Sequence, residues 1–184
     1  MTAGAGRIWS SAAFGLLYIS LYHLSALISE PQETGGLASI FFLPAFVRLL
    51  GFLIVEFWII PALFLASIFL ILTGAYDLGP GNGPEMVITA FTSVGGPFGV
   101  FIASRIGDLK PSLVNLTPLR LLGLSIGCAG GNVAAHYLSL LAIGFDPPTG
   151  HVMATIFLGD LIGTWVIIYL IKIALTVYGR SIRS

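Results

Sequence analysis

Six long apolar stretches, separated by short polar or Gly/Pro-rich segments, dominate the sequence. They cover residues 8–28, 37–55, 59–76, 85–106, 119–143 and 151–178. The hydrocarbon core of a bilayer is about 30 Å thick, and a helix of roughly 20 apolar residues crosses it. The stretches lack the period-two alternation that is typical of transmembrane β-strands. The pattern therefore predicts one polytopic domain, residues 1–184, built as an all-α six-helix transmembrane bundle.

Two features within this pattern indicate irregular backbone. The second and third stretches are separated only by Glu56-Phe57-Trp58, which predicts a very tight turn. The fourth stretch contains Gly95-Gly96-Pro97. An internal proline removes a helical hydrogen bond, so we expect the fourth helix to be interrupted there.

Composition agrees with a membrane protein and leaves no segment for a soluble domain. The chain is 57% hydrophobic and only 9% charged, whereas soluble domains carry about 25% charged residues. A single cysteine, Cys128, excludes an internal disulfide.

Seven of the eight basic residues, all but Arg48, fall on one side of a six-span chain. They are Arg7, Arg105, Lys110, Arg120, Lys172, Arg180 and Arg183. The loops on the other side carry only acidic residues, namely Glu30, Glu33, Asp77, Glu85 and Asp146. Because Lys and Arg are enriched in cytoplasmic loops, we expect both termini to be cytoplasmic.

Two charged residues lie inside apolar stretches. Asp160 interrupts residues 156–171, and Arg48 lies in the second stretch. A charged side chain at that depth costs at least about 2.5–3.5 kcal/mol on insertion scales, so it normally has a partner or faces water. Counting along the spans puts both near mid-membrane, where they can pair and line a ligand site in which Arg48 is available to an anionic headgroup or carboxylate. Alternatively, each faces a water-filled cavity or irregular backbone near Pro44 or residues 95–97.

Glycines recur at spacings that favour close helix packing. Small residues four apart let membrane helices approach each other, within one chain or between copies. The residues concerned are Gly95 and Gly99 in the fourth stretch, Gly123, Gly127 and Gly131 in the fifth, and Gly159 and Gly163 around Asp160.

The three histidines and one asparagine are the remaining candidates for a site. Asn132 and His136 are one turn apart and give the fifth helix a polar, inward-looking face. With His23 and His151 on other helices, His136 could ligate haem, copper or zinc. The spacing matches no metal motif, and hydrogen bonding to a neighbouring helix is the alternative.

Patterns for catalysis are missing from the sequence. It has no HExxH, no phosphate-binding loop and no nucleophile with an adjacent base. We expect a protein that is not an enzyme. The basic segment 105–120 carries few charges and is explained by topology, so no nucleic-acid partner is expected.

Three short motifs resemble the MASE1 family of bacterial membrane sensor domains. They are Phe42-Leu-Pro-Ala-Phe-Val-Arg48, Ile59-Ile-Pro-Ala-Leu-Phe-Leu-Ala66 and Phe157-Leu-Gly-Asp-Leu-Ile-Gly163. The family has a Pro-Ala-Gly element, a short helix, a Pro-Gly-x-Phe-Leu-Gly element and a late Gly-Asp-x-x-Gly. Phe46 replaces the glycine that often follows Pro-Ala in the family.

The resemblance directs attention to Pro44, Arg48, Gly159 and Asp160 as matched positions. It implies a bacterial cytoplasmic (inner) membrane protein that acts as an input module. MASE1 domains usually precede an output domain; we expect a free-standing input module here, and the resemblance then implies signalling by contact with another membrane protein.

Four functional interpretations remain open. The first is a MASE1-like sensor or accessory subunit that binds a small ligand or a membrane protein partner, or forms a homo-oligomer in the bilayer. The second is a small-solute transporter or substrate-binding membrane subunit. The third is a haem- or copper-binding membrane protein, and the fourth is a structural subunit of a larger complex.

Overall fold

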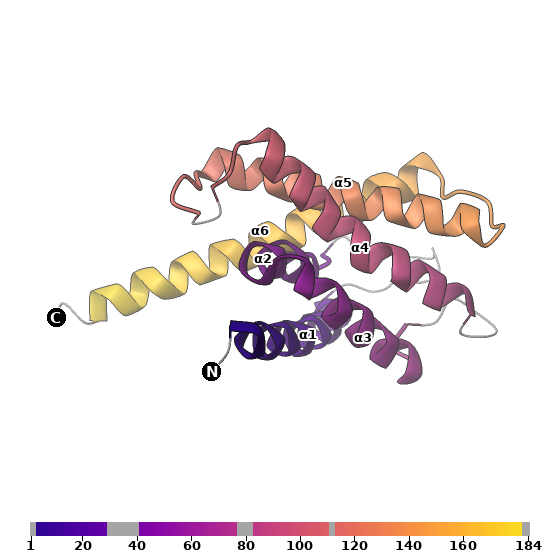
Figure 1. The fold of residues 1–184 in the computed structure, drawn as a ribbon, viewed down its shortest axis with the longest axis horizontal. Coiled ribbons are helices and arrows are strands. Elements are labelled where there is room, and N and C mark those ends of the chain that lie inside the picture. Colours follow the sequence, from indigo (N-terminus) through magenta and orange to yellow (C-terminus); the bar gives the residue numbers. More distant parts are fainter. Residues whose placement is uncertain (1–2, 29–40, 77–82, 111–112, 182–184) are drawn as a thin grey trace.

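The computed structural model describes residues 3–28, 41–76, 83–110 and 113–181, and these are almost entirely helical (Figure 1). The all-α prediction is confirmed. The helices are α1 (Ala3–Ile28), α2 (Ala45–Val55), the short 3-10 helix η1 (Glu56–Trp58), α3 (Ile59–Leu72), α4 (Gly83–Ile106), α5 (Pro118–Ala142) and α6 (Gly150–Ser181).

Among the described residues, four segments are long and apolar enough to cross a membrane, judged by length and composition alone: Ala5–Ile28, Ala45–Leu72, Gly83–Ile106 and Gly150–Tyr178. The chain is thus a multi-pass membrane protein in which apolar helices contact lipid. Helix α5 has 25 residues but is less apolar, because glycines, Asn132 and His136 replace aliphatic side chains along it.

The segment Ala45–Leu72 is a helical hairpin. The backbone N–H of Leu43 donates to Ser25 Oγ of α1 over 3.0 Å. Arg48 reaches Tyr18, earlier in α1, and Glu56 reaches Arg7, earlier still. Later residues of α2 therefore contact earlier residues of α1, so α2 runs antiparallel to α1.

Helix α3 then returns in the direction of α1. Gly15 of α1 lies against the carbonyl of Ala62, and the Tyr22 hydroxyl donates to the carbonyl of Ala75 over 2.9 Å. The reversal occurs at Glu56, whose φ is 54° and which is the first residue of the tight turn that the sequence predicts.

This hairpin corrects the predicted second and third spans. The 11 residues of α2 and the 14 residues of α3 extend roughly 16 and 21 Å at 1.5 Å per residue, less than the roughly 30 Å of a hydrocarbon core. Residues 41–44 are not helical, and residues 37–40 lie outside the described part of the chain. The prediction of two full-length membrane-spanning helices over residues 37–55 and 59–76 is therefore wrong.

Helices α4 and α5 form the most extensive helix pair, and it is antiparallel. A Cβ added at Gly99 would overlap the carbonyl oxygen of Gly127, and one added at Gly95 would overlap that of Gly131. The predicted interruption at residues 95–97 is wrong, because α4 continues as a helix through Pro97. Gly95 and Gly96 instead allow neighbouring elements to approach α4 closely. The predicted span that does contain a non-helical segment is the second one, at residues 41–44, just before α2.

Both termini and the loop between α4 and α5 lie at the same end of the molecule, on the left in Figure 1. This end carries Arg7, Arg105, Lys110 and Arg120. The turn between α5 and α6 lies at the opposite end (Figure 1). Four of the basic residues predicted to share one side thus lie at one end of the fold, whereas Glu30, Glu33 and Asp77 of the opposite loops lie outside the described residues.

Helix α2 occupies the centre of the bundle. It contacts α1, α3, α4, α5 and α6, and Val47 and Leu49 are almost completely buried. Arg48 belongs to the buried part of this helix and is only 4% exposed, so it lies in the protein interior.

Candidate functional site

Arg48 and Asp160 meet in the centre of the bundle. Arg48 Nη1 lies 3.5 Å from Asp160 Oδ2, and the two side chains are only 4% and 3% exposed. Asn132 Nδ2 donates to the same carboxylate oxygen over 2.8 Å. The structure thus brings together the three residues that the sequence offers as ligand or charge-pair candidates.

Three neighbours besides Asp160 surround the Arg48 guanidinium and its stem. Its Nη2 donates to the Tyr18 hydroxyl over 3.1 Å. The guanidinium carbon lies 5.0 Å from the centroid of the Phe42 ring and 5.7 Å from that of Tyr18, within the range of cation–π attraction. Gly96 of α4 faces the stem, since a Cβ there would lie 3.0 Å from Arg48 Cδ. Space for this side chain therefore depends on a glycine.

Asp160 is positioned by the glycines beside it in α6. The N–H of Phe42 donates to the carbonyl of Gly159 over 3.2 Å, and a Cβ at Gly163 would overlap the Phe42 carbonyl. These two glycines let the non-helical residues 41–44 lie directly on α6. Helix α2 therefore begins beside Asp160, and its first turn delivers Arg48 to the carboxylate.

Several buried polar atoms around the pair have no hydrogen-bond partner among the described residues. They are Arg48 Nε, Ser93 Oγ, Asn132 Oδ1, His136 Nδ1 and Arg48 Nη1, the last of which keeps only its ion-pair contact with Asp160. Trp165 Nε1 on α6 also lacks a hydrogen-bond partner among these residues. Leaving one such group unsatisfied costs about 1–3 kcal/mol, so buried polar groups almost always bind protein, water or another ligand. These atoms thus provide both donors and acceptors for a small polar guest.

Polar side chains continue from this centre along α4 and α5. Ser93, Thr89 and Glu85 recur every four residues on α4 and are buried, as are His136 and Ser139 on α5. Ser93 lies one turn from Gly96, which faces Arg48. We call these five residues the polar column; it leads from the Arg48–Asp160 centre towards the first turn of α4, at the end opposite the termini.

Sequence reasoning missed Tyr18 and, apart from His136, the polar column. The four-residue spacing of Glu85, Thr89 and Ser93 was a detectable signal, because it places three polar side chains on one helical face. Tyr18 had no such signal, since a tyrosine in an apolar helix is common and its hydrogen bond depends on where α2 packs.

The three histidines do not lie together in one site. His136 is buried in α5, whereas His23 on α1 and His151 on α6 are exposed. Within the described part of the chain, no three His, Cys, Asp or Glu side chains are placed to hold a metal. The three-histidine ligand set considered for copper or zinc is therefore not formed there.

One glycine expected in the α4–α5 contact lies outside it. Gly127 and Gly131 pack against Gly99 and Gly95, but a Cβ added at Gly123 meets nothing within 4 Å. The third member of the four-residue repeat therefore faces open space rather than α4.

Comparisons with known proteins add no relative. No family model, curated protein or solved structure matches this chain. The resemblance to MASE1 domains therefore rests on the three short motifs alone, and the site has to be interpreted from its own geometry.

Proposed function

We propose that this chain is a membrane sensor or accessory subunit that binds a small polar ligand at the Arg48–Asp160 centre. The observation that carries the proposal is a buried arginine with unpaired donors, beside unpaired polar atoms of Ser93, Asn132 and His136. Intramembrane charges of this kind usually mark functional sites, because a protein that only needed stability would avoid their cost.

The chemistry of the centre favours a ligand with oxygen acceptors, such as a small carboxylate. A guanidinium presents a fork of donors that matches a carboxylate, and Arg48 Nε has no partner among the described residues. Asn132 Oδ1 can accept a hydrogen bond only from a separate O–H or N–H group on such a ligand. Asp160 balances the arginine charge when the site is empty and limits how strongly an anion binds.

The proposed setting is the bacterial cytoplasmic membrane, with both termini in the cytoplasm and six passes. The basic residues at the end that holds the termini support this orientation. In this topology the non-helical residues 41–44 and α2 together make the second pass, which places the start of α2 within the bilayer.

A sensor or accessory role agrees with the MASE1-like motifs, since two of them contain Arg48 and Asp160. Ligand binding between α2, α4, α5 and α6 would change how these helices pack. A membrane protein partner that contacts these helices would then respond to the change in packing.

Native mass spectrometry of protein extracted in mild detergent from its own membrane tests the proposal. Wild-type protein is expected to carry a small-molecule mass that Arg48→Lys loses. This variant keeps the charge beside Asp160 but removes the guanidinium fork. Arg7→Lys, the same change at an exposed arginine, is the matched control and should retain the mass. Equal ligand occupancy in all three proteins would refute Arg48 as the binding residue.

Transport of a small solute is the second candidate. Helix α2 begins beside the ion pair, and transporters commonly build midplane sites from discontinuous helices. The polar column would supply a route from one side of the membrane. Solute uptake into proteoliposomes that disappears with Arg48→Lys would favour transport over sensing, whereas ligand binding without flux would favour sensing.

A further inference from the structure

A long apolar groove runs between α4 and α5 on the face of the molecule away from α1. Its volume is about 1130 Å³, and it extends from Ala90 and Leu138 at one end to Ile106 and Leu119 at the other. Nineteen residues of α5 separate Leu119 from Leu138, roughly 28 Å of helix at 1.5 Å per residue. The groove therefore follows the depth of the hydrocarbon core.

Glycine backbone forms part of the groove lining on the α5 side. Gly123 and Gly130 both line it, and a Cβ added at either position meets nothing within 4 Å. Both side-chain positions are therefore open towards the groove. Exposed large apolar side chains flank them, including Phe98 and Ile126, so the groove is open to lipid and shaped for a thin apolar occupant.

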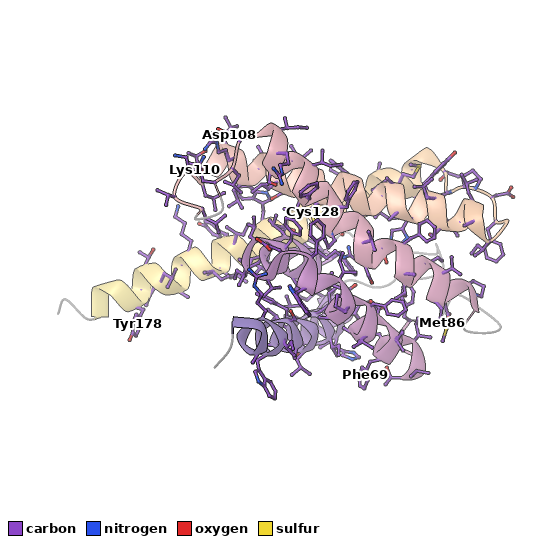
Figure 2. All side chains as sticks on the ribbon, viewed as in Figure 1. Phe69, Met86, Asp108, Lys110, Cys128 and Tyr178 are labelled. Atoms are coloured by element: carbon purple, nitrogen blue, oxygen red, sulfur yellow. The ribbon has the colours of Figure 1, made fainter. Side chains whose placement is uncertain are left out.

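One end of the groove is basic. Arg120 is the charged residue in its lining, and its Nη1 donates to the carbonyl of Asn115 over 2.8 Å. Arg105 and Lys110 belong to the same end, against one acidic residue, Asp108. Figure 2 shows Asp108 and Lys110 on the loop at this end of α4. The end thus combines an apolar channel with a net positive charge.

We propose that this groove binds an anionic phospholipid, with an acyl chain along Gly123 and Gly130 and the phosphate at Arg120. Anionic lipids are attracted by basic residues at the membrane surface, at about 1 kcal/mol each. One lipid would thus fill the apolar groove with an acyl chain and bind the basic end of the groove with its headgroup.

The positive charge at one end of the groove favours a lipid over a second copy of the chain as its occupant. A symmetric dimer in a membrane places like ends together. A second copy on this groove would therefore bring its own basic end against Arg120. A phosphate instead brings opposite charge to the same place.

Lipid binding to detergent-purified, delipidated protein, measured by native mass spectrometry, tests the site. The probes are phosphatidylglycerol and phosphatidylcholine with identical chains, and dihexanoyl phosphatidylglycerol as a short-chain probe. Wild-type protein should prefer the long-chain anionic lipid over both others. Arg120→Gln should reduce the preference for phosphatidylglycerol over phosphatidylcholine about fivefold, from the loss of one basic contact.

Gly130→Leu should abolish binding of both long-chain lipids, because its side chain enters the open groove. Gly123→Leu repeats that test at a second open glycine, and Lys172→Gln is the control for loss of a basic residue elsewhere. Circular dichroism establishes that each variant is folded. Unchanged lipid binding in both folded glycine variants would overturn the proposal. So would a wild-type dimer mass that disappears in them, since a second copy would then occupy the groove.

Discussion

Neutralising Asp160 gives the sharpest stability prediction. Asp160→Asn keeps the shape of the side chain and can keep the contact with Asn132, but it removes the negative charge 3.5 Å from Arg48 Nη1. Breaking a buried ion pair by removing one partner costs about 3–5 kcal/mol, because the other charge stays buried and uncompensated. That is a large share of the roughly 5–15 kcal/mol by which folded proteins are stable.

The reverse change should cost less. Arg48→Met leaves a carboxylic acid that can be neutralised by a proton, whereas a guanidinium keeps its charge in proteins. The double variant Arg48→Met/Asp160→Asn should recover part of the loss of Asp160→Asn, because no unpaired charge remains.

Unfolding by SDS in mixed micelles, followed by helical circular dichroism, measures these three variants against wild type. The coupling energy between the two substitutions should be favourable by at least about 1 kcal/mol, within the range measured for residues in contact. Wild-type stability for Asp160→Asn, or additive losses in the double variant, would refute the pairing argument.

Three further predictions, on the α4–α5 contact, the Tyr18 hydrogen bond and the turn at Glu56, use the same unfolding assay. Gly99→Leu should disrupt the α4–α5 pair, because a Cβ there overlaps a carbonyl of α5, whereas Gly123→Leu should remain folded; equal stability would contradict the assigned helix contact. Tyr18→Phe removes an acceptor 3.1 Å from Arg48 Nη2 and should cost about 1.5–3 kcal/mol, the value of a hydrogen bond to a charged group; no loss would mean that this bond is not formed. Glu56→Gly should raise stability by about 1 kcal/mol, since a positive φ of 54° strains a non-glycine residue more than glycine loses in entropy; a loss would show that the exposed contact with Arg7 outweighs the strain.

Much of the membrane fold follows from apolar length and charge. The boundaries of the first and last three apolar stretches fall within a few residues of α1, α4, α5 and α6, since helices in lipid must satisfy every backbone group internally. The turn at Glu56 was also predictable, because polar residues between two apolar runs leave little alternative. Nothing in the hydropathy, however, distinguished the non-helical residues 41–44 from helix.

The centre was predictable in its charges and unpredictable in its surroundings. Arg48 and Asp160 are rare types at such positions, so their pairing could be inferred from depth alone. The role of Gly96 could not, because helical spacing suggested a helix break at Gly95-Gly96-Pro97. Its purpose is to make space for the Arg48 stem, and this depends on the central position of α2.

The measurement that tests the central claim most directly is a high-resolution crystallographic map of the protein purified from its own membrane. The account predicts non-protein density within hydrogen-bond distance of Arg48 Nε, in contact with Ser93 or Asn132. A map in which protein side chains alone satisfy Arg48, with no density for a ligand, would contradict a binding site there.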